Sequence, residues 1–199
     1  MYQTSVYLTL TCLIFNFTTF GQLSQDDTIL LLKSIKQISD LTPITYLDSS
    51  PFFSRDRLIK KIEAGKIENI SNSVPDAIYL NKEEQELILT EFKTNTKWPD
   101  NILPNSRKIN TDSIWSYLSK VNGNRTEKRN NGDKPISYED LLIEYAYVYS
   151  IDKPIYIRNK TICLITVTAI CGQNCGRTLS IFYKKENKTW KGWIIVRTD

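Results

Sequence analysis

The chain has 199 residues, the size of one ordinary domain, and its 41% hydrophobic and 11% aromatic content excludes a disordered chain. Its 26 basic and 22 acidic residues are interspersed and give a net charge of +4, which suits a solvated surface and is only a weak indication of an anionic partner. Histidine is absent, so Ser-His and Cys-His nucleophile systems are excluded and the commonest metal ligand is missing.

The uncharged N-terminal stretch predicts a signal peptide over residues 1–21. An apolar core at 6–15 is followed by the small residues Thr19 and Gly21, which have the spacing of a cleavage site, and the first charged residue is Asp26. A buried first helix or strand is the alternative, since no Lys or Arg precedes the apolar core. The signal peptide implies export, to the periplasm or as a secreted protein. No later stretch has the ~20 apolar residues of a membrane-spanning helix.

Apolar residues at helical spacing predict that residues 26–149 are mainly helical. Helices are expected at residues 26–38, 54–65, 81–92 and 112–120, with a further one beginning at Ser137. The helix at 81–92 opens with the capping-box pattern Asn81-Lys82-Glu83-Glu84. Residues 74–79 are expected to be extended. The run 122–134 contains no apolar residue, which predicts a mobile loop.

Residues 150–199 change to the alternation of β-strands. Strands are expected at residues 153–157, 161–170, 177–184 and 189–197, and their short connections predict an antiparallel meander of about four strands. The predicted fold class is α+β, a single domain over 22–199 in which N-terminal helices pack on this C-terminal meander.

Both faces of the last two strands are partly apolar. One face is expected to carry Leu179, Ile181, Tyr183, Trp190, Ile194 and Val196, and the other to carry Phe182, Trp193 and Ile195. A sheet of this kind is expected to be covered on both sides, by the N-terminal helices and by a loop or a partner.

Removal of the signal peptide leaves three cysteines, Cys163, Cys171 and Cys175. Glycines beside Cys171 and Cys175 allow a tight loop, which predicts a disulfide between them in an oxidising compartment. The ring is short, so the bridge would shape the loop more than stabilise the fold. Cys163 has the parity of an apolar strand face and is expected to be a buried thiol. Thiol redox chemistry and metal binding are the alternatives, although redox motifs usually set two residues between the cysteines and zinc would need a fourth ligand.

Several short motifs carry a family resemblance. They are Trp98-Pro99-Asp100-Asn101, Pro104-Asn105-Ser106, Lys153-Pro154-Ile155-Tyr156, residues 158–163, the Cys-Gly-x-x-Cys-Gly loop at 171–176, residues 183–187 and Trp190. Through them about the second half of the chain resembles a family of small exported proteins from Bacteroidota that has no assigned function. The family's loop is richer in glycine and leucine, whereas this chain has Gln173, Asn174 and Arg177 there. The resemblance implies export and a strand meander, and it carries over no catalytic residue.

These features favour an exported, non-enzymatic binding or interaction module of the cell envelope. Its partner is expected to be a protein or another envelope component, and no cofactor is expected. The possible interaction surface lies on the last two strands and consists of Tyr183, Lys184, Trp190 and Trp193. Lysines beside these aromatic residues could also contact nucleic acid, but such lysines more often protect strand edges, so no nucleic-acid partner is expected.

The alternative is an enzyme, either a thiol-redox protein or a hydrolase that works without histidine. A hydrolase would need paired carboxylates, for which the sequence offers Glu83 with Glu84 and Glu139 with Asp140. Adjacent residues on a helix point in different directions, so neither pair forms a two-carboxylate site by itself.

Overall fold

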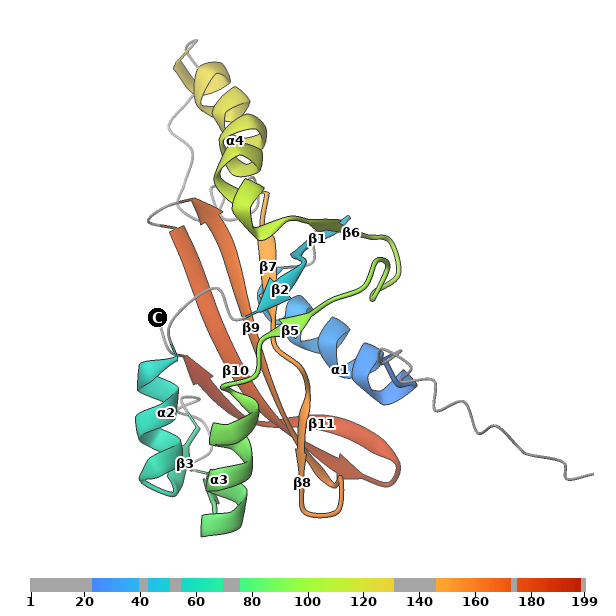
Figure 1. Cartoon of the computed structure of the whole chain (residues 1–199), viewed down its shortest axis with the longest axis vertical. Coiled ribbons are helices and arrows are strands. Elements are labelled where there is room, and N and C mark those ends of the chain that lie inside the picture. Colours follow the sequence, from blue (N-terminus) through green and yellow to red (C-terminus); the bar gives the residue numbers. More distant parts are fainter. Residues whose placement is uncertain are drawn as a thin grey trace, which may run out of the picture.

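The computed structural model describes residues 23–39, 43–50, 55–69, 76–130, 146–172 and 175–197, so the predicted signal peptide and the predicted helix at Ser137 lie outside the described residues. The described chain forms a mixed sheet of seven strands with helices packed on it (Figure 1). The helices are α1 (Gln25–Lys36), α2 (Asp56–Glu63), α3 (Lys82–Glu91) and α4 (Ile114–Asn130), and the 3-10 turn η1 (Thr111–Ser113) precedes α4. Within these ranges no helix has both the length and the apolar character needed to cross a membrane.

The sheet has the strand order β11–β10–β9–β7–β1–β6, and β8 pairs with β9 on the same edge as β7. Its strands are β1 (Ile44–Leu47), β6 (Ser106–Ile109), β7 (Val148–Ile151), β8 (Ile155–Ile157), β9 (Ile162–Gly172), β10 (Cys175–Glu186) and β11 (Thr189–Arg197). Strand β1 is parallel to both β6 and β7, whereas the other pairs in this sheet are antiparallel. Two small antiparallel sheets join β2 (Ser49–Ser50) to β5 (Thr96–Lys97) and β3 (Lys66–Glu68) to β4 (Ala77–Tyr79).

The α+β class is confirmed, and the predicted arrangement of a helical part at 26–149 packed on a meander at 150–199 is matched only in part. Strands β8 to β11 form the meander, yet the same sheet continues into β7, β1 and β6, which come from the region expected to be helical. Strand β1 is buried at all four positions, so it shows no alternation. Its parallel partners are distant in sequence, so no hairpin turn marks the pairing.

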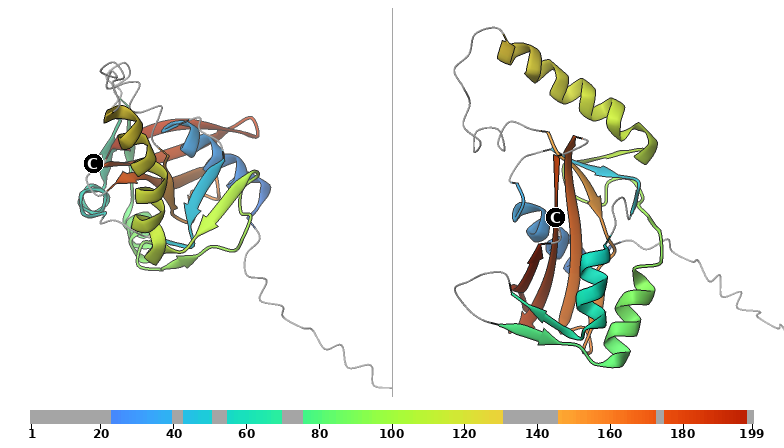
Figure 2. Two further views of the ribbon diagram at one scale, coloured as in Figure 1. Left: turned by 90° about the horizontal axis from the view of Figure 1, so that it is seen from above. Right: turned by 90° about the vertical axis from the view of Figure 1, so that its left-hand side faces the viewer.

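Both faces of the sheet are covered within the described part of the chain (Figure 2). Helix α1 packs on one face against residues of β9 and β10 that include Ile165, Val167, Leu179, Ile181 and Tyr183. Helices α2 and α3 cover the opposite face together with β3 and β4, against Ile162, Leu164, Phe182, Ile194 and Val196. The second face of the sheet, which we expected a loop or a partner to cover, is therefore covered by α2, α3, β3 and β4 of the same chain.

A β-bulge in β11 makes the two faces of the last two strands differ from the prediction. Phe182 pairs with Ile194 and Tyr183 pairs with Gly192, so Trp193 is an extra residue between them. The extra residue reverses the parity of the strand, which places Ile194 and Val196 on the α2–α3 face instead of the α1 face. Trp190 precedes the bulge and stays with Tyr183 under α1.

Helix α4 replaces part of the predicted mobile loop at 122–134. It begins with the apolar residues that the sequence assigned to a short helix and continues to Asn130, while residues 131–134 lie outside the described chain. Ile114 and Leu118 pack against Ile170 near the end of the sheet. Polar residues such as Lys, Arg and Glu are good helix formers, so the absence of apolar residues did not exclude a helix.

Candidate functional site

A groove of about 760 Å³ lies at the start of α1. Three separate parts of the chain line it: Leu23 and Asp27 at the helix, Glu91 with residues 94–99 around β5, and Lys153, Pro154 and Tyr156 at the start of β8. We call this hollow the groove. Its volume lies in the range of about 300–1,000 Å³ that is typical of ligand sites.

Hydrogen bonds fix the wall at residues 94–99 to the large sheet. Trp98 donates its backbone N–H to the carbonyl of Asp48 at 2.8 Å and its indole Nε1–H to the carbonyl of Ile151 at 2.8 Å. The Tyr46 hydroxyl donates to the carbonyl of Pro99 at 2.9 Å. Both anchoring side chains are buried, which makes this wall an ordered surface.

Asp27 is already committed to two structural contacts at the edge of the groove. One carboxylate oxygen accepts the backbone N–H of Ser24 at 2.9 Å, which completes the capping box of α1. The other accepts the hydroxyl of Tyr156 at 2.5 Å. Burial and the nearby Asp27 carboxylate raise the pKa of Tyr156. The pair positions the phenol ring in the groove and leaves Asp27 poorly suited to act as a general base.

A buried ion pair lies behind the groove. Arg55 Nη2 donates to Asp152 Oδ1 at 2.5 Å, and Nη1 donates to the carbonyl of Phe92 at 2.9 Å. The guanidinium also stacks over the Phe92 ring at 4.6 Å. Burial raises the pKa of Asp152, while the Arg55 charge opposes that shift. A cavity of about 10 Å³ beside the pair shares Glu91, Thr94, Thr96 and Lys153 with the groove, so the pair supports the groove wall from inside.

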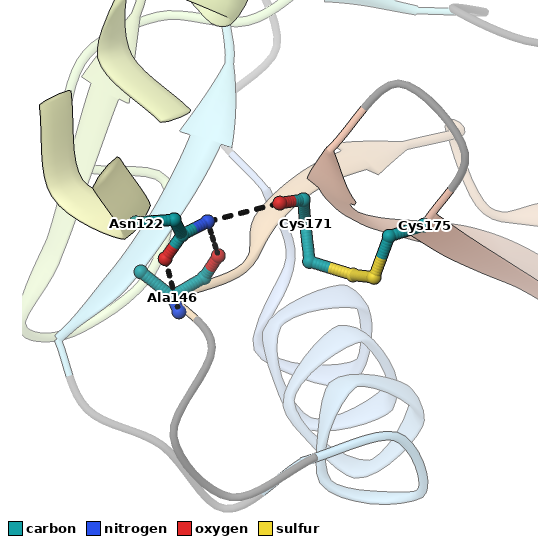
Figure 3. Close-up of a disulfide and its surroundings, with 4 residues drawn as sticks. All are labelled: Asn122, Ala146, Cys171 and Cys175. Atoms are coloured by element: carbon teal, nitrogen blue, oxygen red, sulfur yellow. Dashed lines mark hydrogen bonds between the residues drawn. A yellow bond between two sulfur atoms is a disulfide. The ribbon is translucent and has the colours of Figure 1, made fainter. Parts of the chain in front are cut away.

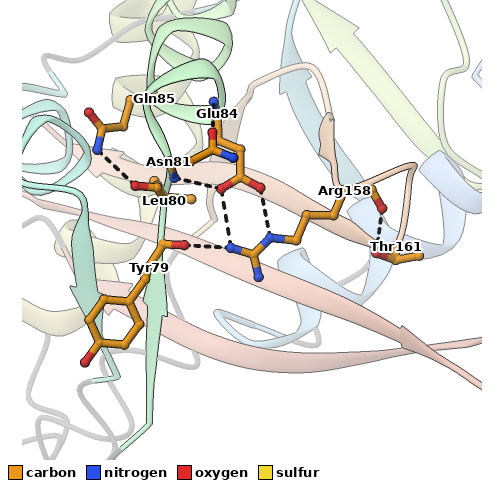
Figure 4. A network of polar contacts seen from close by, with 7 residues as sticks. All are labelled: Tyr79, Leu80, Asn81, Glu84, Gln85, Arg158 and Thr161. Atoms are coloured by element: carbon orange, nitrogen blue, oxygen red, sulfur yellow. Dashed lines mark hydrogen bonds and ion pairs between the residues drawn. The ribbon is translucent and has the colours of Figure 1, made fainter.

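A second polar network joins the β8–β9 turn to α3 (Figure 4). Arg158 donates from Nε to Glu84 Oε1 at 2.8 Å and from Nη2 to the carbonyl of Tyr79 at 2.6 Å. Glu84 also accepts the N–H of Asn81 at 3.1 Å, so one carboxylate serves both the predicted capping box and the ion pair. Arg158 has a φ of 51°, a left-handed conformation that is unfavourable for a residue with a side chain, and these contacts hold it there.

Acidification is expected to release the contribution of Glu84 to stability. Burial acts to raise its pKa, but hydrogen bonds from Arg158 and the Asn81 N–H outweigh burial and hold the pKa below the ordinary value of 4.5. A carboxylate whose pKa is lower in the folded state stabilises the fold above its unfolded pKa and loses that effect as the pH falls through the folded value. We expect Glu84→Gln to lower the free energy of unfolding by about 1 kcal/mol at pH 7.

Urea denaturation of the wild type and Glu84→Gln over a pH series measures this effect. The difference between the two proteins should shrink as the pH falls below about 4.5. Glu83→Gln, on the exposed side of the same helix turn, is the matched control and should show no such convergence. A difference between wild type and Glu84→Gln that stays constant down to the acid transition would contradict the assignment.

The predicted disulfide lies at the hairpin between β9 and β10 (Figure 3). Cys171 and Cys175 are at disulfide distance, with their Cα atoms 5.1 Å apart. Asn122 of α4 donates its Nδ2–H to the carbonyl of Cys171 at 2.9 Å and accepts the N–H of Ala146 at 3.2 Å. These contacts tie the turn end of the β9–β10 hairpin to α4 and to the segment before β7. The cysteine pair therefore lies where α4 meets the end of the sheet.

The four residues of the predicted interaction surface do not lie on one surface. Tyr183 and Trp190 are buried under α1, with 2% and 3% exposure, and the Tyr183 hydroxyl is hydrogen-bonded to the Ser34 hydroxyl at 2.9 Å. Lys184 is exposed on the other face, 5.6 Å from the ring of Trp193, whose indole N–H donates to Asp76. Successive residues of a strand point to opposite faces of the sheet, so the side chains of Tyr183 and Lys184 lie on different faces.

The structure also shows where the described residues that were considered for enzyme chemistry lie. Glu84 is tied to Arg158 while Glu83 is exposed, so the two do not form a carboxylate pair, and Glu139 with Asp140 lies outside the described residues. Burial raises the pKa of the Cys163 thiol. Across the ranges that the structure covers, no three Cys, Asp or Glu side chains gather as a metal site would require.

Sequence reasoning did not identify the groove, although it quoted two of its motifs. Trp98-Pro99 and Lys153-Pro154-Ile155-Tyr156 were named for the family resemblance, and five of their residues line the groove. Comparisons of the chain with protein-family models, curated proteins and solved structures found no match. The groove is therefore the candidate site because of its size, its lining and its anchored wall.

Proposed function

We propose that this protein is an exported, non-enzymatic binding module of the cell envelope, and that the groove holds an extended segment of a partner protein. The observation that carries the proposal is the groove itself, about 760 Å³ in volume and walled by anchored chain segments. The disulfide-distance cysteine pair and the resemblance to small exported proteins support export.

The lining of the groove suits a polypeptide. Leu23, Pro99 and Tyr156 supply exposed apolar surface, and the lining also contains acidic and basic side chains, among them Glu91 and Lys153. A mixed rim complements a chain that carries charges of both signs, and it selects the register of the bound chain more than it adds affinity.

Strand β8 offers backbone groups beside this lining. It pairs with β9, and within the described residues no strand pairs with its other edge. An open strand edge next to side-chain pockets is the usual arrangement in which an extended peptide adds to a sheet.

The positions of the acidic groups favour binding over turnover. Asp27 is held by Ser24 and Tyr156, and Asp152 is buried against Arg55. A histidine-free hydrolase would need two carboxylates facing the same substrate atom, one of them free to take a proton. Asp27, a carboxylate that lines the groove, does not meet this requirement because both of its oxygens already accept hydrogen bonds from the protein.

Peptide selection followed by charge reversal tests the proposal. Peptides enriched on the protein from a display library of random sequences are expected to bind Glu91→Lys and Lys153→Glu about five- to tenfold more weakly, because each change reverses a rim charge. Glu83→Lys and Lys82→Glu make the same changes on the exposed side of α3 and should leave the affinity unaltered.

Three outcomes would contradict the proposal. Equal binding to all four variants would place the peptide site elsewhere. If no peptide of the library were enriched on the protein, the peptide-binding role would be contradicted. Cleavage of an enriched peptide, detected by mass spectrometry, would instead support the hydrolase alternative.

A further inference from the structure

Helix α4 and the cysteine pair meet through one side chain (Figure 3). Asn122 of α4 donates its Nδ2–H to the carbonyl of Cys171 at 2.9 Å and, at the longer distance of 3.5 Å, to the carbonyl of Ala146. Its Oδ1 accepts the backbone N–H of Ala146 at 3.2 Å. None of these three residues lines the groove, so this contact is independent of the proposed peptide binding.

The apolar contact between α4 and the sheet is small. Ile114 and Leu118, with Tyr117 beside them, pack on Leu47, Ile109, Val148 and Ile170. The other two apolar clusters of the described residues contain many more side chains. Asn122 lies one turn after Leu118, so it adds a polar contact on the same side of the helix. An element held by few buried contacts opens at a lower cost than the main core.

Cys171 is the extra residue of a β-bulge. Ile170 pairs with Gly176 and Gly172 pairs with Cys175, so no residue of β10 stands opposite Cys171. The regular ladder therefore does not fix the position of Cys171. The restraints that the structure gives it are the bridge to Cys175, with the two Cα atoms 5.1 Å apart, and the hydrogen bond from Asn122.

Asn122 depends on the Cys171 carbonyl while α4 is docked. The residue is only 8% exposed, so water cannot readily replace a lost partner. A buried amide that loses its hydrogen bond is penalised by its desolvation. The docked position of α4 is therefore favoured only while the Cys171 carbonyl stays in place.

We infer that the cysteine pair is a redox switch for the docking of α4. The closed bridge holds Cys171 where Asn122 bonds to it. A dithiol reductant opens the bridge: the S–S bond breaks, the dithiol becomes a disulfide, and its two electrons and two protons leave Cys171 and Cys175 as thiols. Cys175 is half-buried whereas Cys171 is 5% exposed, so the reductant approaches from the side of Cys175.

Reduction shifts the equilibrium between docked and undocked α4 because the Asn122–Cys171 contact exists only in the docked form. Without the bridge, the bulged end of the hairpin frays and the carbonyl of Cys171 moves away from Asn122. Undocking uncovers Val148 and Ile170, both of which are fully buried in the docked form.

Amide hydrogen exchange of the oxidised protein and of the same protein reduced with dithiothreitol tests the switch. Reduction is expected to speed exchange at least about tenfold at residues 118–122 of α4 and at residues 146–149, since an undocked helix of this length is marginal in water. Amides of α2, which packs in a separate cluster, should be unchanged and serve as the internal control.

Variants separate the switch from a general loss of stability. Cys171→Ser combined with Cys175→Ser should exchange like the reduced protein with or without dithiothreitol. Asn122→Ala removes the link, so its oxidised and reduced forms should exchange equally fast at α4. Asn122→Asp loses the donor to Cys171 and keeps an acceptor for Ala146, and it replaces the alanine variant if that does not fold. Asn95→Ala, at an exposed asparagine, should keep the wild-type difference.

Equal exchange at α4 in the oxidised and reduced wild type would overturn the inference, because the bridge would then shape only the hairpin. A redox difference that survives in Asn122→Ala would also overturn it, since the coupling would not run through Asn122. So would faster exchange in α2 and α4 alike, which would mean that reduction unfolds the whole domain. Peptide binding in the groove is measured separately and does not bear on these results.

Discussion

Replacement of Asp152 by asparagine is expected to lower the free energy of unfolding by about 3–5 kcal/mol, the cost of leaving a buried charge without its partner. The side chains of Arg55 and Asp152 are only 8% and 9% exposed, so solvent cannot screen the Arg55 charge that is left without its negative partner. Urea denaturation followed by far-UV circular dichroism measures the change. Because the pair lies behind the groove, peptide affinity should fall in the same variant.

The ion pair of Lys66 with Glu68 is the matched control. Its atoms are 2.6 Å apart, yet its side chains are 49% and 67% exposed. Solvent screens such a pair, so Glu68→Gln should change stability very little. A joint replacement, Arg55→Met with Asp152→Leu, removes both charges and should recover much of the stability lost in Asp152→Asn. Equal, small effects of Asp152→Asn and Glu68→Gln would contradict the structural role given to the buried pair.

Phe182→Ala is expected to cost about 3–5 kcal/mol of unfolding free energy. The ring is fully buried between β10 and the α2–α3 layer, in the cluster that includes Leu164 and Ile194. Truncation removes apolar burial and leaves a cavity that two packed layers cannot easily close. Thermal or urea unfolding measures the loss.

Two companion variants make the second result interpretable. Phe182→Leu retains most of the apolar volume and should cost about 1.5 kcal/mol or less. Leu87→Ala, on α3, truncates a side chain that is 42% exposed and should stay within about 0.5 kcal/mol. A small effect of Phe182→Ala would mean that α2 and α3 do not pack tightly on the sheet.

The helices and the C-terminal strands were predictable because their signals are local. The helix expected at 26–38 is observed at Gln25–Lys36, and the capping box at Asn81 and Glu84 forms as its pattern predicted. The pairing of β1 with β6 and β7 was not predictable, because it depends on contacts between distant segments. The bulge at Trp193 also has no local signal, and it decides which face Ile194 and Val196 occupy.

The candidate site was harder to predict than the fold. The aromatic residues Tyr183 and Trp190 suggested a surface, but α1 covers them, and a single sequence does not show which side of an apolar strand a helix will cover. The groove is built from three segments that only the tertiary structure brings together. The cysteine pair was accessible to sequence reasoning because its four-residue separation is itself local.

Mapping a selected peptide on the protein by amide chemical-shift changes tests the central claim most directly. A peptide bound in the groove should perturb amides of residues 94–98 and of Lys153 and Tyr156, on both walls, and should leave α2 unaffected. Perturbations confined to the α2–α3 layer, with both walls of the groove unchanged, would contradict the claim that the groove is the binding site of this module.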